Sequence, residues 1–143
     1  MPILSGLNLK NKTAILYVSG GDHGPKLGQA LSEAGASLFV VGRNQPMVEN
    51  VLNSLDGEDH SGYVLPDSAY GKIEKAMDIF EKKYQNVDIL VNDARSFFAR
   101  PFTSITSDEL AQIHDRNVRI PFLLSQQAVA RMVAAKYGRI VNI

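Results

Sequence analysis

Two periodicities of apolar residues alternate along this chain. Runs in which nearly every residue is apolar or β-branched occur at positions 13–18, 37–42, 63–65, 87–92 and 138–143. Such runs are typical of parallel strands, because both faces of each strand are buried. The segments between them carry apolar residues every three to four positions, which predicts amphipathic helices. This alternation indicates an α/β fold, with helices on both faces of a parallel sheet.

Start and stop signals set the expected limits of the helices. Pro25 predicts the start of the first helix, since proline at the first helical position loses no needed N–H, and Gly35 predicts its end. Thr106 and Glu109 have the spacing of a capping box, which predicts the start of a long helix. We therefore expect helices over residues 25–34, 46–55, 72–84 and 106–135.

Composition excludes several classes of function. Fifteen basic and fifteen acidic side chains balance among 143 residues, so we expect no nucleic-acid or membrane partner. The chain has no cysteine and its three histidines are far apart, so we expect no metal site. The opening residues Met1–Gly6 lack the pattern of a signal peptide, and no apolar stretch approaches the ~20 residues that span a bilayer. We expect one cytoplasmic domain over residues 1–143.

A glycine-rich segment follows the first predicted strand and contains Gly20, Gly21, Gly24 and Gly28. Glycines in this place let backbone N–H groups approach a pyrophosphate at the positive end of the next helix. An ordinary tight turn is the alternative interpretation.

A basic residue follows the second predicted strand, where this kind of fold faces the adenosine ribose. An acidic side chain there would accept a hydrogen bond from a 2′-hydroxyl, but the sequence has Gly42 and then Arg43. The planar guanidinium suits a 2′-phosphate, and His23 could add a partial positive charge. The pattern favours NADP over NAD; the alternative is that Arg43 is simply solvated.

Five segments together match one known family: Val18–Gly24, Val41–Asn44, Asp88–Ala94, Asn117 with Phe122, and Gly138–Ile143. In their order and spacing the chain resembles the short-chain dehydrogenase/reductase family over essentially its whole length. Within that family it looks most like the gluconate or sugar-acid reductases, through the Arg100-Pro101 loop and the segment Phe122–Gln126. We expect a Rossmann-type doubly wound sheet with strand order 3-2-1-4-5, truncated after the fifth strand. The resemblance implies an NADP-dependent oxidoreductase acting on a small carbonyl or alcohol substrate.

The resemblance also assigns roles to single residues. Asn117 would be the helix asparagine of the family's catalytic tetrad. Asp67 or a neighbour would contact the adenine, while Asn92 and Ala94 would pack against the cofactor and brace the sheet. The implied cofactor site comprises Ser19, Gly20, Asp22, His23, Gly24, Arg43, Asp67, Asn92 and Ala94.

A proline supports the assignment of Asn117. Pro121 has no N–H, so it cannot donate the helical hydrogen bond to the Asn117 carbonyl four residues earlier. That carbonyl would be free to bind a water, which the resemblance links to a proton relay. The alternative is a plain kink, with the Asn117 side chain bonded across to the neighbouring strand loop.

Two motifs depart from the family pattern. The third glycine is usual two places after Gly24, where this chain has Lys26; alternatively, Gly24 is that third glycine and the loop is shorter by two residues. The family's Asn-Asn-Ala-Gly is replaced by residues 92–95, Asn-Asp-Ala-Arg. Arg95 would strain any backbone with positive φ, and its side chain could either bind a phosphate or block the nicotinamide.

A proton donor at a family position is missing. None of the five tyrosines is followed four residues later by lysine, so the family's Tyr-x-x-x-Lys is absent. We expect the chain alone to be inactive. The alternative function is a non-catalytic dinucleotide-binding or degenerate structural module. The unpaired last strand predicts a homo-oligomer, because an open apolar edge invites association.

Overall fold

The computed structural model describes residues 8–143, so Met1–Gly6 lie outside the described part. Five strands form one sheet in the order β3-β2-β1-β4-β5, and every neighbouring pair is parallel. The predicted α/β class and the predicted strand order are both confirmed. The strands are β1 (Thr13–Val18), β2 (Ser37–Gly42), β3 (Ser61–Val64), β4 (Ile89–Asp93) and β5 (Arg139–Asn142).

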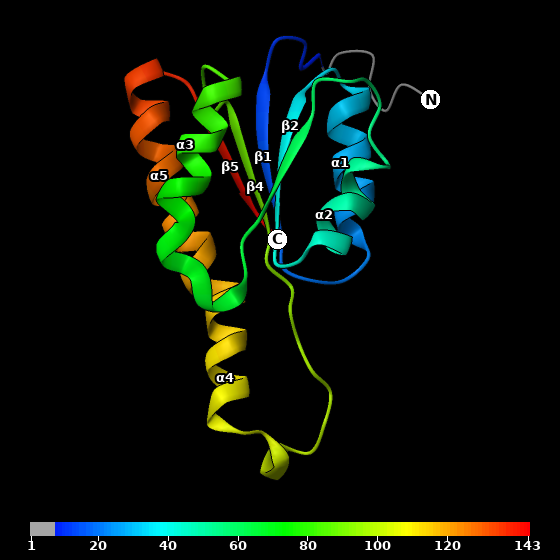
Figure 1. The fold of residues 1–143 in the computed structure, drawn as a ribbon, viewed down its shortest axis with the longest axis vertical. Helices are drawn as coiled ribbons and strands as arrows, with labels where there is room; N and C mark the ends of the chain where they lie inside the picture. Colours follow the sequence, from blue (N-terminus) through cyan, green and yellow to red (C-terminus); the bar gives the residue numbers. More distant parts are fainter. Residues whose placement is uncertain (1–7) are drawn as a thin grey trace.

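Helices cover both faces of this sheet. In Figure 1 α3 and α5 lie on one side, and α1 and α2 lie on the other. The α-helices are α1 (His23–Glu33), α2 (Gln45–Leu52), α3 (Ile73–Lys83), α4 (Ser107–His114) and α5 (Ile120–Ala135). The 3₁₀ turns η1 (Asp67–Lys72) and η2 (Phe102–Ser104) and the π-helical turn η3 (Asp115–Arg119) complete the structure.

Each face has its own apolar core, because successive strand residues point to opposite sides. On the α3/α5 side, Phe39 packs against Phe80 with their ring centroids 5.5 Å apart. On the α1/α2 side, Leu16 and Val40 pack with Val51. All of these side chains are buried. Because both faces of β1 and β2 are buried, nearly all of their residues are apolar.

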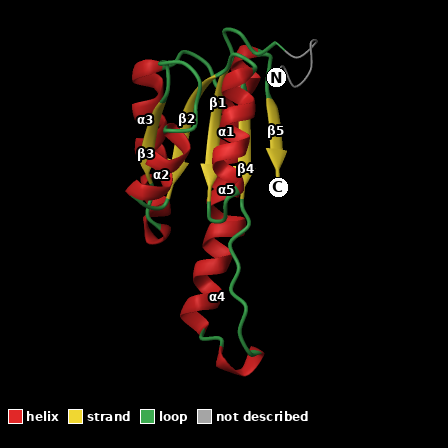
Figure 2. Ribbon diagram, turned by 90° about the vertical axis from the view of Figure 1, so that its right-hand side faces the viewer, coloured by secondary structure: helices red, strands yellow, loops and turns green. Residues whose placement is uncertain are grey.

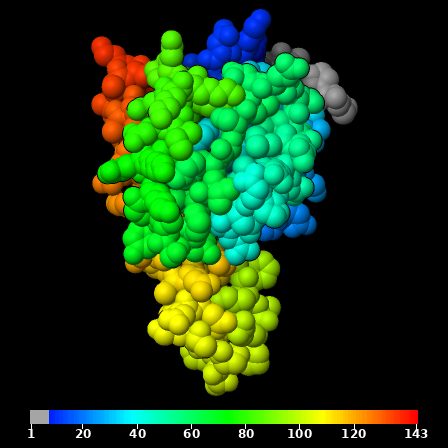
Figure 3. Space-filling view, in the orientation of Figure 1, coloured from blue at the N-terminus to red at the C-terminus, as the bar shows by residue number. Residues whose placement is uncertain are grey.

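The end of β4 leads into an arm, here defined as residues 95–114. Figure 2 shows α4 and the segment before it extending past the carboxyl ends of the strands, and Figure 3 shows the arm as a narrower extension of the main body. The predicted capping box is present: the Glu109 N–H donates to Thr106 Oγ1 at 3.2 Å, and the Thr106 N–H donates to Glu109 Oε2 at 2.9 Å. The helical path then continues through η3 into α5, as far as the predicted Ala135.

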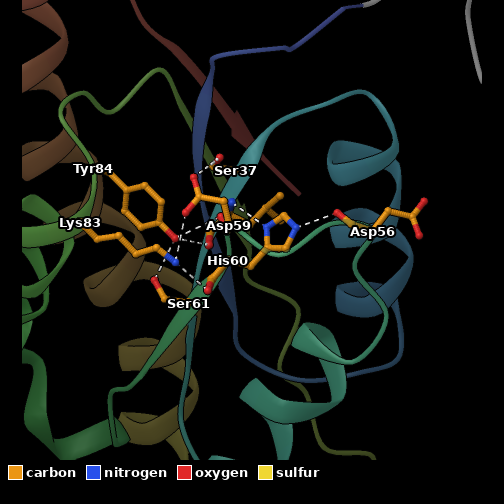
Figure 4. A network of polar contacts seen from close by, with 8 residues as sticks. Ser37, Asp56, Asp59, His60, Ser61, Lys83 and Tyr84 are labelled. Atoms are coloured by element: carbon orange, nitrogen blue, oxygen red, sulfur yellow. Dashed lines mark hydrogen bonds and ion pairs between the residues drawn. The ribbon is translucent and has the colours of Figure 1, made fainter.

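The amino edge of the sheet, where the strands begin, is closed by a network of polar contacts (Figure 4). The Tyr84 hydroxyl donates to the Leu38 carbonyl at 3.1 Å and bonds Ser61 Oγ at 2.9 Å. Lys83 Nζ donates to the His60 carbonyl at 2.9 Å. These contacts join the end of α3 to the beginnings of β2 and β3.

His60 and Asp59 complete this network. The Leu38 N–H donates to His60 Nδ1 at 3.1 Å, so Nδ1 is unprotonated and the proton on Nε2 is donated to the Asp56 carbonyl at 2.8 Å. Asp59 accepts from Ser37 Oγ at 2.9 Å and pairs with Lys83 at 3.3 Å. The hydrogen bond from Ser37, followed by the bond and charge of Lys83, holds the pKa of Asp59 below its usual value.

Residues 8–143 contain no helix that is both long and apolar enough to cross a membrane. The same residues contain no cluster of three or more histidine, aspartate or glutamate side chains able to hold a metal ion.

Candidate functional site

The glycine segment forms a tight connection from β1 to α1. Only Ser19–Asp22 separate the strand from the helix, and Gly21 supplies the turn with a φ of +76°. Gly24 is buried, and a Cβ on it would lie 2.8 Å from Val18 Cγ1 and 3.2 Å from Val51 Cγ2. Close helix–strand packing is the role of the third glycine in a dinucleotide-binding turn. The packing of Gly24 fits that role and favours the alternative with the shorter loop.

This packing also corrects the predicted start of α1. The helix begins at His23 and not at Pro25. Proline is still tolerated at Pro25, because the first four N–H groups of a helix have no partner within the helix. Asp22 stands at the N-cap but makes no capping hydrogen bond with its side chain, and both Asp22 and His23 are exposed.

Ser19 lies at the base of the turn and is only 1% exposed. Its N–H donates to the Asp93 carbonyl at 3.0 Å, and its own carbonyl accepts from Ser96 Oγ at 2.8 Å. Gly20 lies close to the same serine, since a Cβ on it would be 3.3 Å from Ser96 Oγ. The segment after β4 therefore packs directly on the glycine turn. Ser96 was missed by the sequence analysis.

Arg43 lies immediately after β2, beside this turn, because Gly42 pairs with Val18 in the parallel register. Its side chain is partly buried, and Nε is enclosed with no hydrogen-bond partner in the described part of the chain. Among residues 8–143 Arg43 makes no ion pair. The next residue, Asn44, caps α2 by accepting from the Met47 N–H at 3.0 Å.

Asp67, expected near the adenine, is engaged by a cation that the sequence analysis did not single out. Arg116 Nη2 donates to Asp67 Oδ2 at 2.6 Å, which joins η1 to η3. The other carboxylate oxygen, Oδ1, is buried without a partner. The pair spans 49 positions in sequence, so no local pattern marks it.

Asn92 is fully buried and joins three elements. Its Nδ2 donates to Ser125 Oγ on α5 at 3.2 Å and to Asn142 Oδ1 on β5 at 2.8 Å. Ala94 follows β4, and its N–H donates to the Ile143 carbonyl at 3.3 Å. The sheet is therefore braced at the positions where bracing was predicted.

Asn117 lies in the π-helical turn η3 and reaches across to the segment after β4. Its Nδ2 donates to the Ser96 carbonyl at 2.7 Å, and its Oδ1 accepts from the Ser96 N–H at 2.9 Å. Pro121 can donate no N–H to the Asn117 carbonyl. The side-chain contact of the kink alternative is therefore present, while the water on the Asn117 carbonyl stays a prediction.

Tyr17, which the sequence analysis did not assign to the site, donates a hydrogen bond to a second carbonyl of η3. The π register pairs the Ile120 N–H with the Asp115 carbonyl, and the Tyr17 hydroxyl donates to the Arg116 carbonyl at 3.1 Å. Burial, and next to it the charge of Asp67, raises the pKa of Tyr17 far above its usual value. Tyr17 therefore remains a neutral donor and ties the end of β1 to the π-helical turn.

The Asn-Asp-Ala-Arg segment differs from expectation at its last residue. Within residues 8–143, only Asn11 and Lys136 have positive φ among residues other than glycine, so the strain expected at Arg95 is absent. Arg95 Nε instead donates to Asp93 Oδ1 at 2.8 Å. Asp93 is fully buried.

Buried polar atoms without hydrogen-bond partners gather at this carboxyl edge. Native proteins leave few such atoms unpaired, and each one calls for an explanation such as a bound ligand or water. Within residues 8–143 there are seven, and all lie at or just beyond the carboxyl ends of the strands or in η3. They are Ser19 Oγ, Arg43 Nε, Asp67 Oδ1, Asn92 Oδ1, Asp93 Oδ2, Arg95 Nη2 and Arg116 Nε.

A cavity of about 340 Å³ lies at the same edge, between the end of β5 and the start of α5. Residues of the Asn117 turn and of the two last strands line it, and Phe122 on its wall is 64% exposed. The lining comprises Ala94, Asn117, Val118, Pro121, Phe122, Ser125, Asn142 and Ile143. The edge thus combines a glycine turn, unpaired guanidinium and hydroxyl groups, three unpaired carboxylate or amide oxygens, and an adjoining cavity.

Comparison with known families gives a match over most of the chain. A family model described as short chain dehydrogenase matches residues 14–143. The uncharacterized oxidoreductase YvaG of Bacillus subtilis is 30% identical over 139 residues, covering 96% of this chain and 52% of YvaG. An uncharacterized oxidoreductase of Staphylococcus aureus, SA2266, is 27% identical over 137 residues, covering 94% and 58%. The chain spans about half the length of the curated relatives it matches.

Solved structures share the fold. A short-chain dehydrogenase/reductase from Burkholderia xenovorans superposes with a TM-score of 0.81 at 20% identity, covering 94% of this chain and 56% of that one. A xylitol dehydrogenase bound to NAD⁺ superposes with a TM-score of 0.75 at 23% identity, covering 96% and 54%.

Proposed function

The chain belongs to the short-chain dehydrogenase/reductase family, and from this we propose that it forms the cofactor half of an NADP(H)-dependent oxidoreductase. The substrate is a small carbonyl or alcohol compound, and a bound dinucleotide supplies or accepts the hydride. Arg43 is the observation that carries the NADP preference. It follows β2 where the adenosine ribose lies in such folds, and its enclosed Nε has no partner.

The residues present fit such a cofactor. Ser19 and Gly20 form the turn toward the pyrophosphate, and the N-terminal end of α1 at His23 carries the partial positive charge that favours an anion. Asp67 is held by Arg116, so an adenine contact there comes from its second oxygen or from a neighbour. Asn92 and Ala94 keep β4 and β5 at a fixed spacing beside the site.

Asn117 is the family's helix asparagine by position, and we propose that its backbone carbonyl holds a water in the proton path. Its side chain is already occupied by Ser96, which orients the turn without taking part in proton transfer. The chain contains no Tyr-x-x-x-Lys, so we expect no carbonyl reduction by these residues alone.

Calorimetric titration of the 143-residue chain with NADPH and with NADH tests this function. We expect NADPH to bind more tightly, and Arg43→Ala to weaken NADPH by about tenfold to hundredfold while leaving NADH unchanged, since a hydrogen bond to a charged group contributes about 1.5–3 kcal/mol. Absence of binding by either nucleotide would remove the cofactor function and favour the degenerate structural module. An equal loss for both nucleotides in the variant would remove the NADP preference.

The substrate class follows from the narrower resemblance. We propose a polar compound of the sugar-acid type, on the basis of the Arg100-Pro101 loop and the segment after Pro121. Arg100 pairs with Glu109 at 2.7 Å, and Phe122 borders the cavity beside Asn117. Competition between gluconate and a hydrophobic alcohol for the NADPH-loaded protein would test this, with tighter binding expected for gluconate.

Homo-oligomerisation is proposed for the surface beside β5. Val129 and Val133 of α5 and Val141 of β5 are all exposed, and a groove of about 420 Å³ runs along the end of α5. A second copy of this chain would bury these apolar side chains. Sedimentation should give a dimer or larger species, whereas a strictly monomeric protein would contradict the proposal. A cytoplasmic location stays a prediction, to be checked by fractionation.

A further inference from the structure

Arg95 occupies a place where the family pattern has glycine, next to the residue that packs on the glycine turn. The next residue, Ser96, donates from Oγ to the Ser19 carbonyl at 2.8 Å, and a Cβ on Gly20 would be 3.3 Å from the same oxygen. A side chain at position 95 therefore starts one residue from the turn that faces the pyrophosphate.

Among residues 8–143, the Arg95 guanidinium is held from one side only. Its Nε donates to Asp93 Oδ1 at 2.8 Å, and Asp93 is fully buried. At the other end of the guanidinium, Nη2 is enclosed without a hydrogen-bond partner, although 35% of the side chain is exposed. A guanidinium carries five N–H donors in a rigid fork, and with Nε bound to Asp93 the donors on the exposed part of the side chain are left for an anion.

We expect the glycine turn of this chain to bind an anion less well than the family's usual loop does. With Gly24 as the third glycine, the family resemblance implies a glycine two residues earlier, and this chain has Asp22 there. Asp22 adds a negative charge at the start of α1, and its carboxylate makes no capping bond there. A cation near the turn would offset this negative charge.

We propose that Arg95, oriented by Asp93, binds the pyrophosphate of the dinucleotide and replaces contacts that the shortened glycine turn no longer makes. This rests on the proposed dinucleotide binding, but it assigns a different phosphate from the one assigned to Arg43. Arg43 distinguishes NADPH from NADH, whereas Arg95 acts on every ligand that carries the pyrophosphate. The buried Ser19 hydroxyl, which also lacks a partner, lies at the same turn and supports an anion site there.

The test titrates wild type and the variants Arg95→Ala and Arg95→Lys with NADPH, NADH and ADP-ribose in a calorimeter. Arg139→Ala is the matched control, because it removes the same charge at the start of β5, on the opposite edge of the sheet. We expect Arg95→Ala to weaken all three ligands by a similar factor of about ten or more, as for the loss of a hydrogen bond to a charged group. Arg95→Lys should recover part of that affinity, and Arg139→Ala should match wild type.

The three ligands distinguish the ways in which the Arg95 proposal could be wrong. If Arg95 obstructs the nicotinamide, Arg95→Ala tightens NADPH and NADH but leaves ADP-ribose unchanged, and the proposal is overturned. Unchanged affinity for all three ligands overturns it as well, while the cofactor function stands as long as wild type binds NADPH. No binding of any ligand to wild type overturns both. Thermal unfolding without nucleotide confirms that the Arg95 variants are folded.

Discussion

At the amino edge of the sheet polar side chains bind one another, whereas at the carboxyl edge seven buried polar atoms have no partner among residues 8–143. Tyr84 and His60 illustrate the first edge, since their polar atoms are bonded to backbone or neighbouring side chains. Ser19 and Arg95 illustrate the second. The polar contacts of the amino edge maintain the fold. Under the proposed function the carboxyl edge is the one that binds the cofactor, and its unpaired atoms are consistent with that proposal.

The largest effect on stability is expected at Gly24, because this residue both packs α1 against β1 and belongs to the glycine turn. Gly24→Val would place side-chain atoms within the volume of Val18 and Val51, which overpacks the α1/β1 contact and costs about 2–3 kcal/mol. The displaced helix would also lose nucleotide affinity. Urea unfolding measures the first effect and calorimetry the second. Gly71→Val is the control, because no atom lies within 4 Å of a Cβ there; equal losses in both variants would contradict the packing role.

The next largest effect is expected from opening the amino edge. Tyr84→Phe leaves the buried Leu38 carbonyl without the hydroxyl donor, which costs about 1–2 kcal/mol. Nucleotide affinity should not change, because the network lies at the opposite edge from the glycine turn. Tyr70→Phe is the control, since Tyr70 is exposed and its hydroxyl makes no hydrogen bond within residues 8–143. A loss of NADPH binding in Tyr84→Phe would break the division between the two edges.

A smaller, pH-dependent effect is expected at Asp59. Because the folded-state pKa of Asp59 is lowered, its contribution is present above the ordinary aspartate pKa of about 3.9 and is lost as the pH falls through the lowered value. Asp59→Asn should therefore cost less than about 1 kcal/mol at pH 7, as for an exposed ion pair, and this cost should shrink as the pH falls through the lowered pKa. Urea unfolding at a series of pH values from 7 downward checks this, with Glu58→Gln as the exposed neighbouring control. A cost that does not change with pH would show that charge is not the cause.

The smallest effect on stability is expected from Ser19→Ala. The Ser19 hydroxyl is buried without a partner, so removing it relieves a desolvation cost and changes the free energy of unfolding by no more than about 0.5 kcal/mol. Ser96→Ala is the matched comparison, because it removes the donor to the Ser19 carbonyl and should cost about 1 kcal/mol. A larger loss in Ser19→Ala than in Ser96→Ala would mean that the carboxyl edge is stabilised internally.

The sequence predicts the strands better than the contacts between their ends. The bounds of β1 and β2 were predicted correctly, because strands buried on both faces leave an uninterrupted apolar run. The start of α1 was wrong by two residues, since it depends on how closely Gly24 approaches Val18 and not on where a proline is tolerated.

Site residues divide in a similar way. Asn92 and Asn117 were identified through a resemblance, and the position of Pro121 gave an independent physical reason for the second. The Asp67–Arg116 and Tyr17–Arg116 contacts could not be predicted, because they join residues 49 and 99 positions apart. The seven unpaired atoms are likewise visible only when the whole edge is assembled.

The Asn117 side chain bonds the Ser96 backbone in the same way as the backbone of a neighbouring strand would. A carboxamide presents a donor and an acceptor side by side, the same pair that a peptide group offers, and Ser96 meets it with its own N–H and carbonyl. Aspartate has the same shape but no donor, so it would set a carboxylate against the Ser96 carbonyl. Leucine would fill the space and bond neither group. Position 117 therefore requires the donor and acceptor of a carboxamide, although side chains of similar volume would fit there. The two hydrogen bonds between Asn117 and Ser96 align a helix with a loop that is not paired with it in a sheet.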